Sequence, residues 1–216
     1  MIPKKLLATT LVALLSLLPA ARAGEIVVEP SKGVVPTDEF PFKQGVVEIE
    51  FNGGGFQSIG TKGTPERPNM GFGIAEIRAG YMLTNTIGSG LLRGNVEILG
   101  EIFGGGIYDG PGSDLVGFDA FLRYNFVQPN AKLVPFFQAG GGGVYSDAAQ
   151  ADKIQRLIGS DMSFSLEAEI GARYFISRNW ALNVGFEYRH ISNADTASRN
   201  RGLNALGGVL GINTFF

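Results

Sequence analysis

The amino-acid sequence predicts an all-β protein, an eight-stranded antiparallel transmembrane β-barrel of the outer-membrane type. Three observations support this fold class. The chain begins with a stretch typical of an export signal, it contains 32 glycines, 16 phenylalanines and 6 tyrosines, and its remainder alternates apolar and polar residues without a long apolar run. An exported chain that is rich in glycine and aromatic residues, but has no apolar stretch of about 20 residues beyond its signal, is typical of a membrane barrel.

The N-terminal segment is expected to be a secretory signal peptide spanning residues 1–23. Two lysines precede an apolar run, and Ala-Arg-Ala stands before Gly24, as in a signal cleavage site. A retained N-terminal anchor is the alternative, although the apolar run is shorter than the about 20 residues of a membrane-spanning helix. Residues 24–216 then form a single barrel domain, in which the proline-containing segment 24–44 is expected to be irregular.

The first four strands are predicted from segments in which every second residue is apolar and the others are small or polar. The expected spans are 45–57, 71–83, 91–104 and 114–126. The polar positions carry charge, with Glu48 and Glu50 in the first strand, Glu76 and Arg78 in the second, Arg93, Glu97 and Glu101 in the third, and Asp119 and Arg123 in the fourth.

The last four strands are predicted at 132–146, 161–176, 180–191 and 203–215 by the same alternation. In the sixth, Phe164, Leu166, Ala168, Ile170, Ala172 and Tyr174 share one face, while Ser163, Ser165, Glu167, Glu169, Gly171 and Arg173 share the other. The first, third, fifth and seventh connections are expected to be the longer ones, as external loops of a barrel are. The chain ends in Phe216, as outer-membrane barrels end in an aromatic residue.

A charged face opposite an apolar face favours a barrel whose exterior meets lipid and whose interior pairs charges. A soluble lipocalin-like barrel is the alternative. The interior carboxylates are interpreted as partners of arginines rather than as catalytic acids or metal ligands, because Arg78, Arg93, Arg123, Arg173 and Arg189 share their face. The glycine-rich stretches do not match a phosphate-binding loop.

Composition excludes several function classes. The chain has no cysteine and one histidine, so neither a disulfide framework nor a zinc site is expected, and no metal or other cofactor is predicted. Eighteen basic residues against 20 acidic residues give no argument for a nucleic-acid partner.

The single histidine lies on the lipid-facing side of the seventh strand. Apolar residues occupy every second position from Trp180 to Tyr188, and the same period continues to His190 and Ser192. In the eighth strand, the face formed by Leu206, Leu210 and Ile212 also includes Asn204. Because these strands are hairpin neighbours, a group of serine, histidine and asparagine is expected at the outer end of the barrel. The non-catalytic interpretation is that both strands end there and that these polar residues contact lipid headgroups and water.

The stretch "HISNADTASRNRGLN" resembles the C-terminal signature of the lipid A 3-O-deacylases of the PagL type. That signature runs His-x-Ser-Asn-Ala, then Asn-x-Gly, then an acidic or amide residue two positions later. The matching residues are His190, Ser192, Asn193, Ala194, Asn200, Gly202 and Asn204. The local match covers about fifteen residues, and the expected signal peptide, length and barrel fit the family over the whole chain. The characterised family pattern has glutamate where this chain has Asn204.

The resemblance implies an outer-membrane serine esterase that removes an ester-linked acyl chain from lipid A of lipopolysaccharide. By that resemblance, Ser192 would be the nucleophile, His190 the general base and Asn204 the third member of the triad. Asn200 would stabilise the oxyanion, with Asn193 and Gly202 in support. The partners implied are lipopolysaccharide and outer-membrane lipid, with the active site on the outer-leaflet side. The oligomeric state stays open, a homodimer being one option. The alternative function is a non-catalytic outer-membrane barrel, structural or adhesive, with binding loops.

Overall fold

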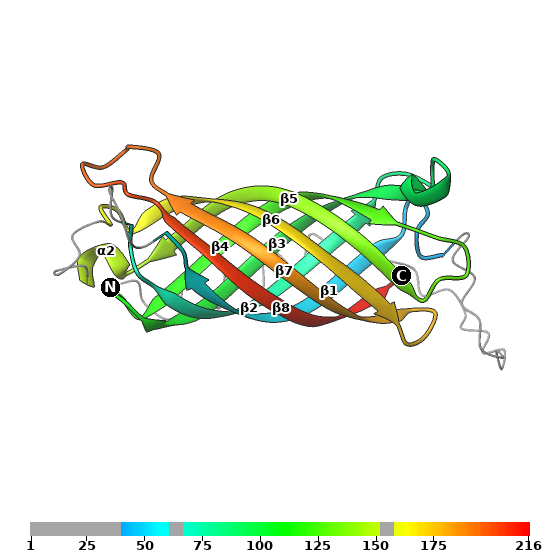
Figure 1. Ribbon diagram of the computed structural model, residues 1–216, viewed down its shortest axis with the longest axis horizontal. Coiled ribbons are helices and arrows are strands. Elements are labelled where there is room, and N and C mark those ends of the chain that lie inside the picture. Colours follow the sequence, from blue (N-terminus) through cyan, green and yellow to red (C-terminus); the bar gives the residue numbers. More distant parts are fainter. Residues whose placement is uncertain (1–39, 61–66, 152–157) are drawn as a thin grey trace. The chain divides into compact units, whose positions relative to one another are not determined.

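Eight strands form a closed antiparallel barrel, which confirms the predicted fold class (Figure 1). The structure is a computed structural model that describes residues 40–60, 67–151 and 158–216. Each strand pairs with its neighbours along the chain, and β8 pairs with β1 to close the barrel. The strands are β1 (Val47–Ser58), β2 (Gly71–Met82), β3 (Gly94–Asp109), β4 (Asp114–Phe126), β5 (Leu133–Ser146), β6 (Met162–Phe175), β7 (Trp180–Ser192) and β8 (Leu203–Phe215).

The N-terminal expectations are tested only in part. All described residues belong to one compact unit, which lies within residues 34–216. The predicted signal peptide therefore lies outside the described residues. Of the segment 24–44, residues 40–44 are described and form bends and a turn rather than a strand. Among the described residues, no helix is long and apolar enough to cross a membrane.

The third strand differs most from its predicted span. Residues 90–92 form a short 3₁₀ helix, η1 (Gly90–Leu92), and the strand continues to Asp109 instead of ending at 104. A side chain at Gly105 would overlap the carbonyl group of Gly73, so this glycine allows β3 to stay close to β2. The connection between β3 and β4 is consequently short, and the connection between β2 and β3 is long. The predicted alternation of loop lengths fails at these two places.

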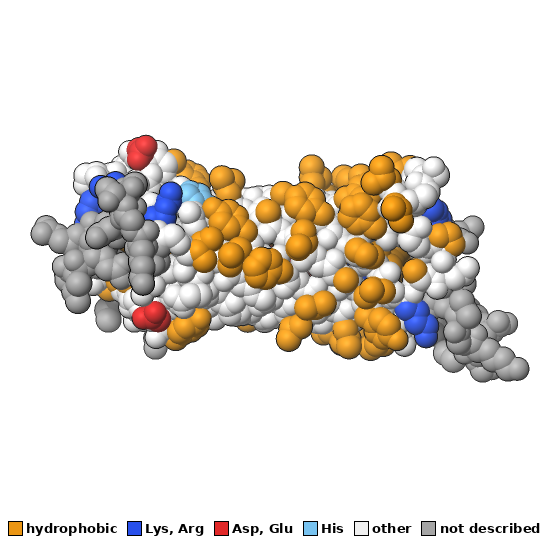
Figure 2. Space-filling view, viewed as in Figure 1, with side chains coloured by type: hydrophobic (Ala, Val, Ile, Leu, Met, Phe, Trp, Pro, Cys, Tyr) orange, Lys and Arg blue, Asp and Glu red, His pale blue; other side chains and the backbone are white. Residues whose placement is uncertain are grey.

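The two faces of the strands are as predicted. Apolar side chains cover the visible outer wall, while charged side chains gather at its two ends (Figure 2). On β6, Leu166 is 61% exposed, whereas Glu167 beside it is only 4% exposed. Within the described chain, the second short helix, α2 (Ala148–Ala151), lies in the connection between β5 and β6.

The interior has apolar packing at both ends and charged groups between them. One apolar cluster, which includes Phe56, Phe72 and Leu203, fills the end near α2. The other includes Phe42, Phe175 and Phe215. Between them, Arg78, Arg123, Arg173 and Arg189 are buried among carboxylates, as expected for a barrel of this size. Between the two ends, side chains of the described residues therefore fill the interior.

Arg93 departs from its predicted place in this network. It follows η1 and precedes β3, is only half-buried, and donates from Nη1 to the backbone oxygen of Val127 at 2.8 Å. Its guanidinium therefore stabilises the turn at the end of the barrel. The reason is that β3 begins at Gly94, three residues later than predicted, so that Arg93 precedes the strand.

Candidate active site

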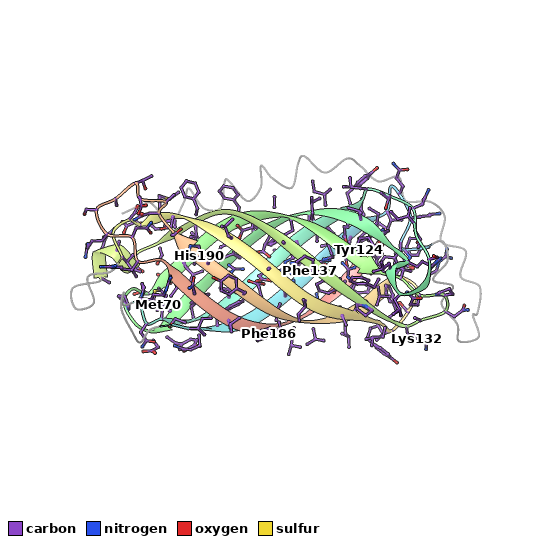
Figure 3. The ribbon with its side chains drawn as sticks, turned by 45° about the horizontal axis from the view of Figure 1, so that its top comes forward. Met70, Tyr124, Lys132, Phe137, Phe186 and His190 are labelled. Carbon is purple, nitrogen blue, oxygen red and sulfur yellow. The ribbon has the colours of Figure 1, made fainter. Side chains whose placement is uncertain are left out.

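The predicted site residues lie where β7 ends and β8 begins. His190 is directly opposite Asn204 in the antiparallel register of these two strands. Figure 3 shows His190 at the same end of the barrel as Met70, with Lys132 and Tyr124 near the other end. Because directly opposed residues on neighbouring strands point to the same face, the hairpin brings the imidazole and the amide together. The predicted approach of Asn204 to His190 is confirmed.

The imidazole of His190 is held by one specific hydrogen bond. Its Nδ1 lies 2.6 Å from Oδ1 of Asn204. An amide oxygen only accepts hydrogen bonds, so Nδ1 carries the hydrogen and Nε2 keeps a free lone pair. This is the tautomer that a general base at Nε2 requires.

Tyr188 is a second partner of the same amide oxygen. Its hydroxyl donates to Oδ1 of Asn204 at 3.0 Å. Tyr188 precedes His190 by two residues on β7, so both side chains project from the same face of the strand. The two hydrogen bonds together orient the Asn204 amide with its oxygen toward His190. The alternation placed Tyr188 on this face, but its contact with Asn204 depends on the register with β8.

Ser192 lies next along the same face, two residues beyond His190 and opposite Phe164 of β6. It is half-buried. Within the described ranges, the structure records no hydrogen bond of its hydroxyl and therefore none to His190. The strand geometry places His190 and Ser192 on one side of the barrel wall, but the structure shows no hydrogen bond between these two side chains.

A tight turn follows Ser192. The backbone N–H and the hydroxyl of Thr196 both donate to the carbonyl of Asn193, at 3.0 and 2.7 Å. Between them, Ala194 and Asp195 have positive φ angles of 50° and 62°. Positive φ at both central residues is the pattern of a type I′ turn, which reverses the chain directly after the strand. The turn fixes where the chain goes after Ser192.

Asn193 and Asn200 support each other across the loop between β7 and β8. The backbone N–H of Asn193 donates to Oδ1 of Asn200 at 3.1 Å, and Nδ2 of Asn193 donates to the carbonyl of Arg199 at 2.9 Å. The side chain of Asn200 in turn donates from Nδ2 to Asp195 at 2.9 Å. An amide nitrogen has two hydrogens, so one N–H of Asn200 remains for another acceptor.

Gly202 makes room for the imidazole. Its φ is 62°, in the left-handed region that favours glycine. A Cβ at this position would lie 3.0 Å from Cε1 and 3.7 Å from Nε2 of His190. The close approach explains why a glycine stands beside the histidine.

Arg67, in the connection between β1 and β2, also reaches this corner of the barrel. Its Nη1 donates to the carbonyl oxygens of Arg201 and Gly202, at 3.2 and 3.5 Å. Sequence reasoning did not identify Arg67, because it is more than 130 residues away from its partners along the chain and carries no motif.

No carboxylate pairs with His190 among the described residues. Glu187 is fully buried inside the barrel, where Arg189 donates to it at 3.0 Å. Asp195 accepts from Asn200 in the loop. The orienting group is therefore the neutral amide of Asn204, which can set the histidine tautomer but supplies no negative charge.

A small cavity of about 60 Å³ lies at this end of the barrel. Ser192, Asn193, Asn200 and Gly202 are among its lining residues, together with apolar side chains such as Ile191. Oδ1 of Asn193 is buried and makes no hydrogen bond within the described chain. Four of the six predicted site residues thus border one hollow, while His190 and Asn204 lie on the wall beside it.

The chain was compared with known proteins. The family model described as lipid A 3-O-deacylase (PagL) matches residues 88–213. The crystal structure of the outer membrane enzyme PagL is similar at a TM-score of 0.53 and 16% identity, over 76% of this chain and 97% of that one. The crystal structure of Neisserial surface protein A (NspA) is similar at a TM-score of 0.56 and 15% identity, over 79% of this chain and 99% of that one. The comparison with curated protein sequences found no match.

Proposed function

The chain belongs to the lipid A 3-O-deacylase (PagL) family, and we propose that it is an outer-membrane serine esterase that removes an ester-linked acyl chain from lipid A. The single observation that carries this proposal is the hydrogen bond between Nδ1 of His190 and Oδ1 of Asn204, 2.6 Å long, on the outward face of the barrel. It leaves Nε2 available as a base on the side where a lipid would lie.

The proposed reaction proceeds in two steps. Nε2 of His190 takes the proton of the Ser192 hydroxyl as the serine oxygen attacks the acyl carbonyl carbon. The tetrahedral intermediate then collapses, the C–O bond to the sugar breaks, and the imidazolium returns the proton to the leaving sugar oxygen. Water, deprotonated by His190, releases the fatty acid from Ser192 and restores the hydroxyl. The proposal requires the Ser192 hydroxyl to turn toward Nε2 when substrate is bound.

The oxyanion of each intermediate needs a hydrogen-bond donor. We assign this role to the second N–H of Asn200, because Asn193 and Asp195 already fix the other polar groups of that side chain. Loss of one such donor costs on the order of 10²–10³ in rate. Gly202 supports the site by keeping the space beside Nε2 open.

The site's position favours a substrate that approaches from the membrane. His190 is half-exposed at the rim of a wall covered with apolar side chains, where Leu166 on β6 is 61% exposed. An acyl chain lying along this wall would bring its ester bond to the level of Ser192. We therefore propose that the partner is lipopolysaccharide and that the site faces the outer leaflet.

The proposal is tested by expressing the barrel in a lipopolysaccharide-containing outer membrane and measuring the mass of lipid A. The expected result is the loss of one hydroxyacyl chain, which Ser192→Ala and His190→Ala abolish. Ser160→Ala is the matched control, because Ser160 borders the same cavity and has no proposed role in the chemistry. An unchanged lipid A mass with a correctly folded barrel would favour a non-catalytic barrel instead.

A further inference from the structure

The charges inside the barrel do not balance. Nine buried carboxyl groups face four buried guanidinium groups among the described residues. The carboxyl groups belong to Glu48, Glu50, Glu76, Glu97, Glu101, Asp119, Glu167, Glu169 and Glu187, and the guanidinium groups to Arg78, Arg123, Arg173 and Arg189. A buried charge without compensation is costly, so the excess carboxyl groups either bind protons or have a further cation beside them.

Two pairs of carboxylates lie directly opposite each other in the barrel wall. Described arginines compensate both members of only one of these pairs. Glu169 of β6 is opposite Glu187 of β7, and Arg78 bridges them at 2.8 and 3.3 Å. Glu101 of β3 is opposite Asp119 of β4. Like charges in opposed positions repel each other.

At the second place, only Glu101 has arginine partners. Nε of Arg78 lies 2.5 Å from Glu101, and Nη2 of Arg189 lies 3.5 Å from it. Asp119 is 3% exposed, and the structure records no ion pair to it from any described basic residue. Its Oδ1 accepts a hydrogen bond from the hydroxyl of Ser165, and its Oδ2 makes none. Asp119 is thus a buried carboxyl group with one oxygen unpartnered.

Asp119 belongs to a compact group of three carboxyl groups. Glu101, Asp119 and Glu167 each offer an oxygen, and these three atoms lie within 4.8 Å of one another. Arg189 approaches from one side, with Nε 3.0 Å from Oε1 of Glu167. Oε1 of Glu101 and this Oε1 of Glu167 make no hydrogen bond, although both lie beside the Arg189 guanidinium. An ion at the centre of such a triangle would lie at most about 2.8 Å from each oxygen, so a small inward movement of the side chains would bring all three to coordinating distance.

We propose that this group binds a hard divalent cation, calcium foremost, inside the barrel. Carboxylate and hydroxyl oxygens are the ligands that calcium and magnesium prefer, and calcium accepts six to eight oxygens in flexible geometry. The hydroxyl of Ser165 is a fourth oxygen beside the group. Gly142 of β5 stands between Asp119 and Ser165 in the strand register, so no side chain from β5 separates them.

The site is a structural one and is distinct from the proposed active site. Glu167 points into the barrel, whereas its neighbour Leu166 points outward and is paired with His190. A cation at Glu167 would therefore stabilise the wall directly behind the imidazole. This inference revises the sequence-based expectation that arginines alone balance the interior carboxylates.

The test is to refold the whole barrel into zwitterionic detergent micelles without lipopolysaccharide, in EDTA, in Ca²⁺ or in Mg²⁺. Refolding is needed because a buried ion exchanges slowly. Metal bound after desalting is measured by mass spectrometry, and stability by urea unfolding. The expected results are one calcium per barrel and a folding equilibrium constant at least tenfold higher in Ca²⁺ than in EDTA.

Two variants make the test specific. Asp119→Asn keeps the shape of the side chain but removes its charge, so it is expected to abolish both the bound calcium and the difference between Ca²⁺ and EDTA. Glu169→Gln removes a buried carboxylate that Arg78 already compensates, and it is expected to keep the calcium. Equal stability of the unmodified barrel in Ca²⁺ and EDTA, with no bound metal, would overturn the proposal and assign the compensating charge to protons.

Discussion

At the scale of single residues, the question is how an amide acts where the family pattern has glutamate. Asn204 accepts hydrogen bonds from both His190 and Tyr188, at 2.6 and 3.0 Å, so both lone pairs of its oxygen are used. The hydrogen bond from His190 to this fixed amide therefore orients the imidazole. What the amide lacks is the negative charge that stabilises an imidazolium, which a carboxylate at this position would supply.

Substitution of Asn204 should separate the contribution of imidazole orientation from the contribution of a negative charge. We expect Asn204→Ala to lower the rate of lipid A deacylation by about 10- to 100-fold, since a hydrogen bond to a charged group contributes ~1.5–3 kcal/mol. Asn204→Glu should preserve or raise the rate, because it adds charge while keeping an acceptor. The measurement is deacylation in micelles, with refolding followed by electrophoretic mobility. Equal rates for all three proteins would mean that another residue orients His190.

At the scale of the elements, glycines decide how closely neighbouring strands approach. A side chain at Gly105 of β3 would overlap the Gly73 carbonyl of β2, whereas one at Gly100 of the same strand would meet nothing within 4 Å. The extension of β3 beyond its predicted end therefore depends on particular glycines. Glycines in a barrel wall are not interchangeable.

These two positions provide a matched pair of variants. Gly105→Ala is expected to destabilise the barrel by about 1–3 kcal/mol, the usual cost of overpacking. Gly100→Ala should leave the free energy of unfolding unchanged within about 0.5 kcal/mol. Urea unfolding in micelles measures both. The explanation of the β3 extension would be wrong if the two variants behaved alike.

The β7–β8 hairpin shows what an element's sequence can and cannot reveal. Alternation from Trp180 to Tyr188 places His190 and Ser192 on the outer face, and the register agrees, because they lie opposite the exposed Leu166 and Phe164 of β6. The end of β3 was missed, because alternating residues and glycines continue through a stretch that also resembles a loop. The alternation of residue types along a strand predicts which face each residue occupies. Where the strand ends depends on whether the neighbouring strand still forms backbone hydrogen bonds with it.

At the scale of the whole barrel, the buried arginines hold together strands that are distant in sequence. Arg78 of β2 forms ion pairs with Glu50, Glu76, Glu101, Glu169 and Glu187. These partners belong to β1, β2, β3, β6 and β7, so one guanidinium connects both sides of the barrel. The role of Arg78 is to compensate the charge of several carboxylates at once, more than to attract any one of them.

Removal of this guanidinium should therefore be severe. We expect Arg78→Met to lower the free energy of unfolding by at least about 3–5 kcal/mol, the cost of leaving buried carboxylates uncompensated. Arg178→Met is the control, because Arg178 is exposed in the turn between β6 and β7 and stacks on Phe40. It should change stability by less than about 1 kcal/mol. Similar losses for both variants would contradict a special role for Arg78.

The sequence by itself determined the strand count, the two faces of each strand and the residues of the proposed site, since alternation with period two follows from local backbone geometry. Only the tertiary structure decided the contacts. Asn204 lies opposite His190, Tyr188 donates to the same Asn204 oxygen, and Arg67 donates to the carbonyl of Gly202. None of the described arginines pairs with Asp119. The physical reason is that register and barrel closure bring together residues far apart along the chain. Arg78 and Glu169, for example, are 91 positions apart.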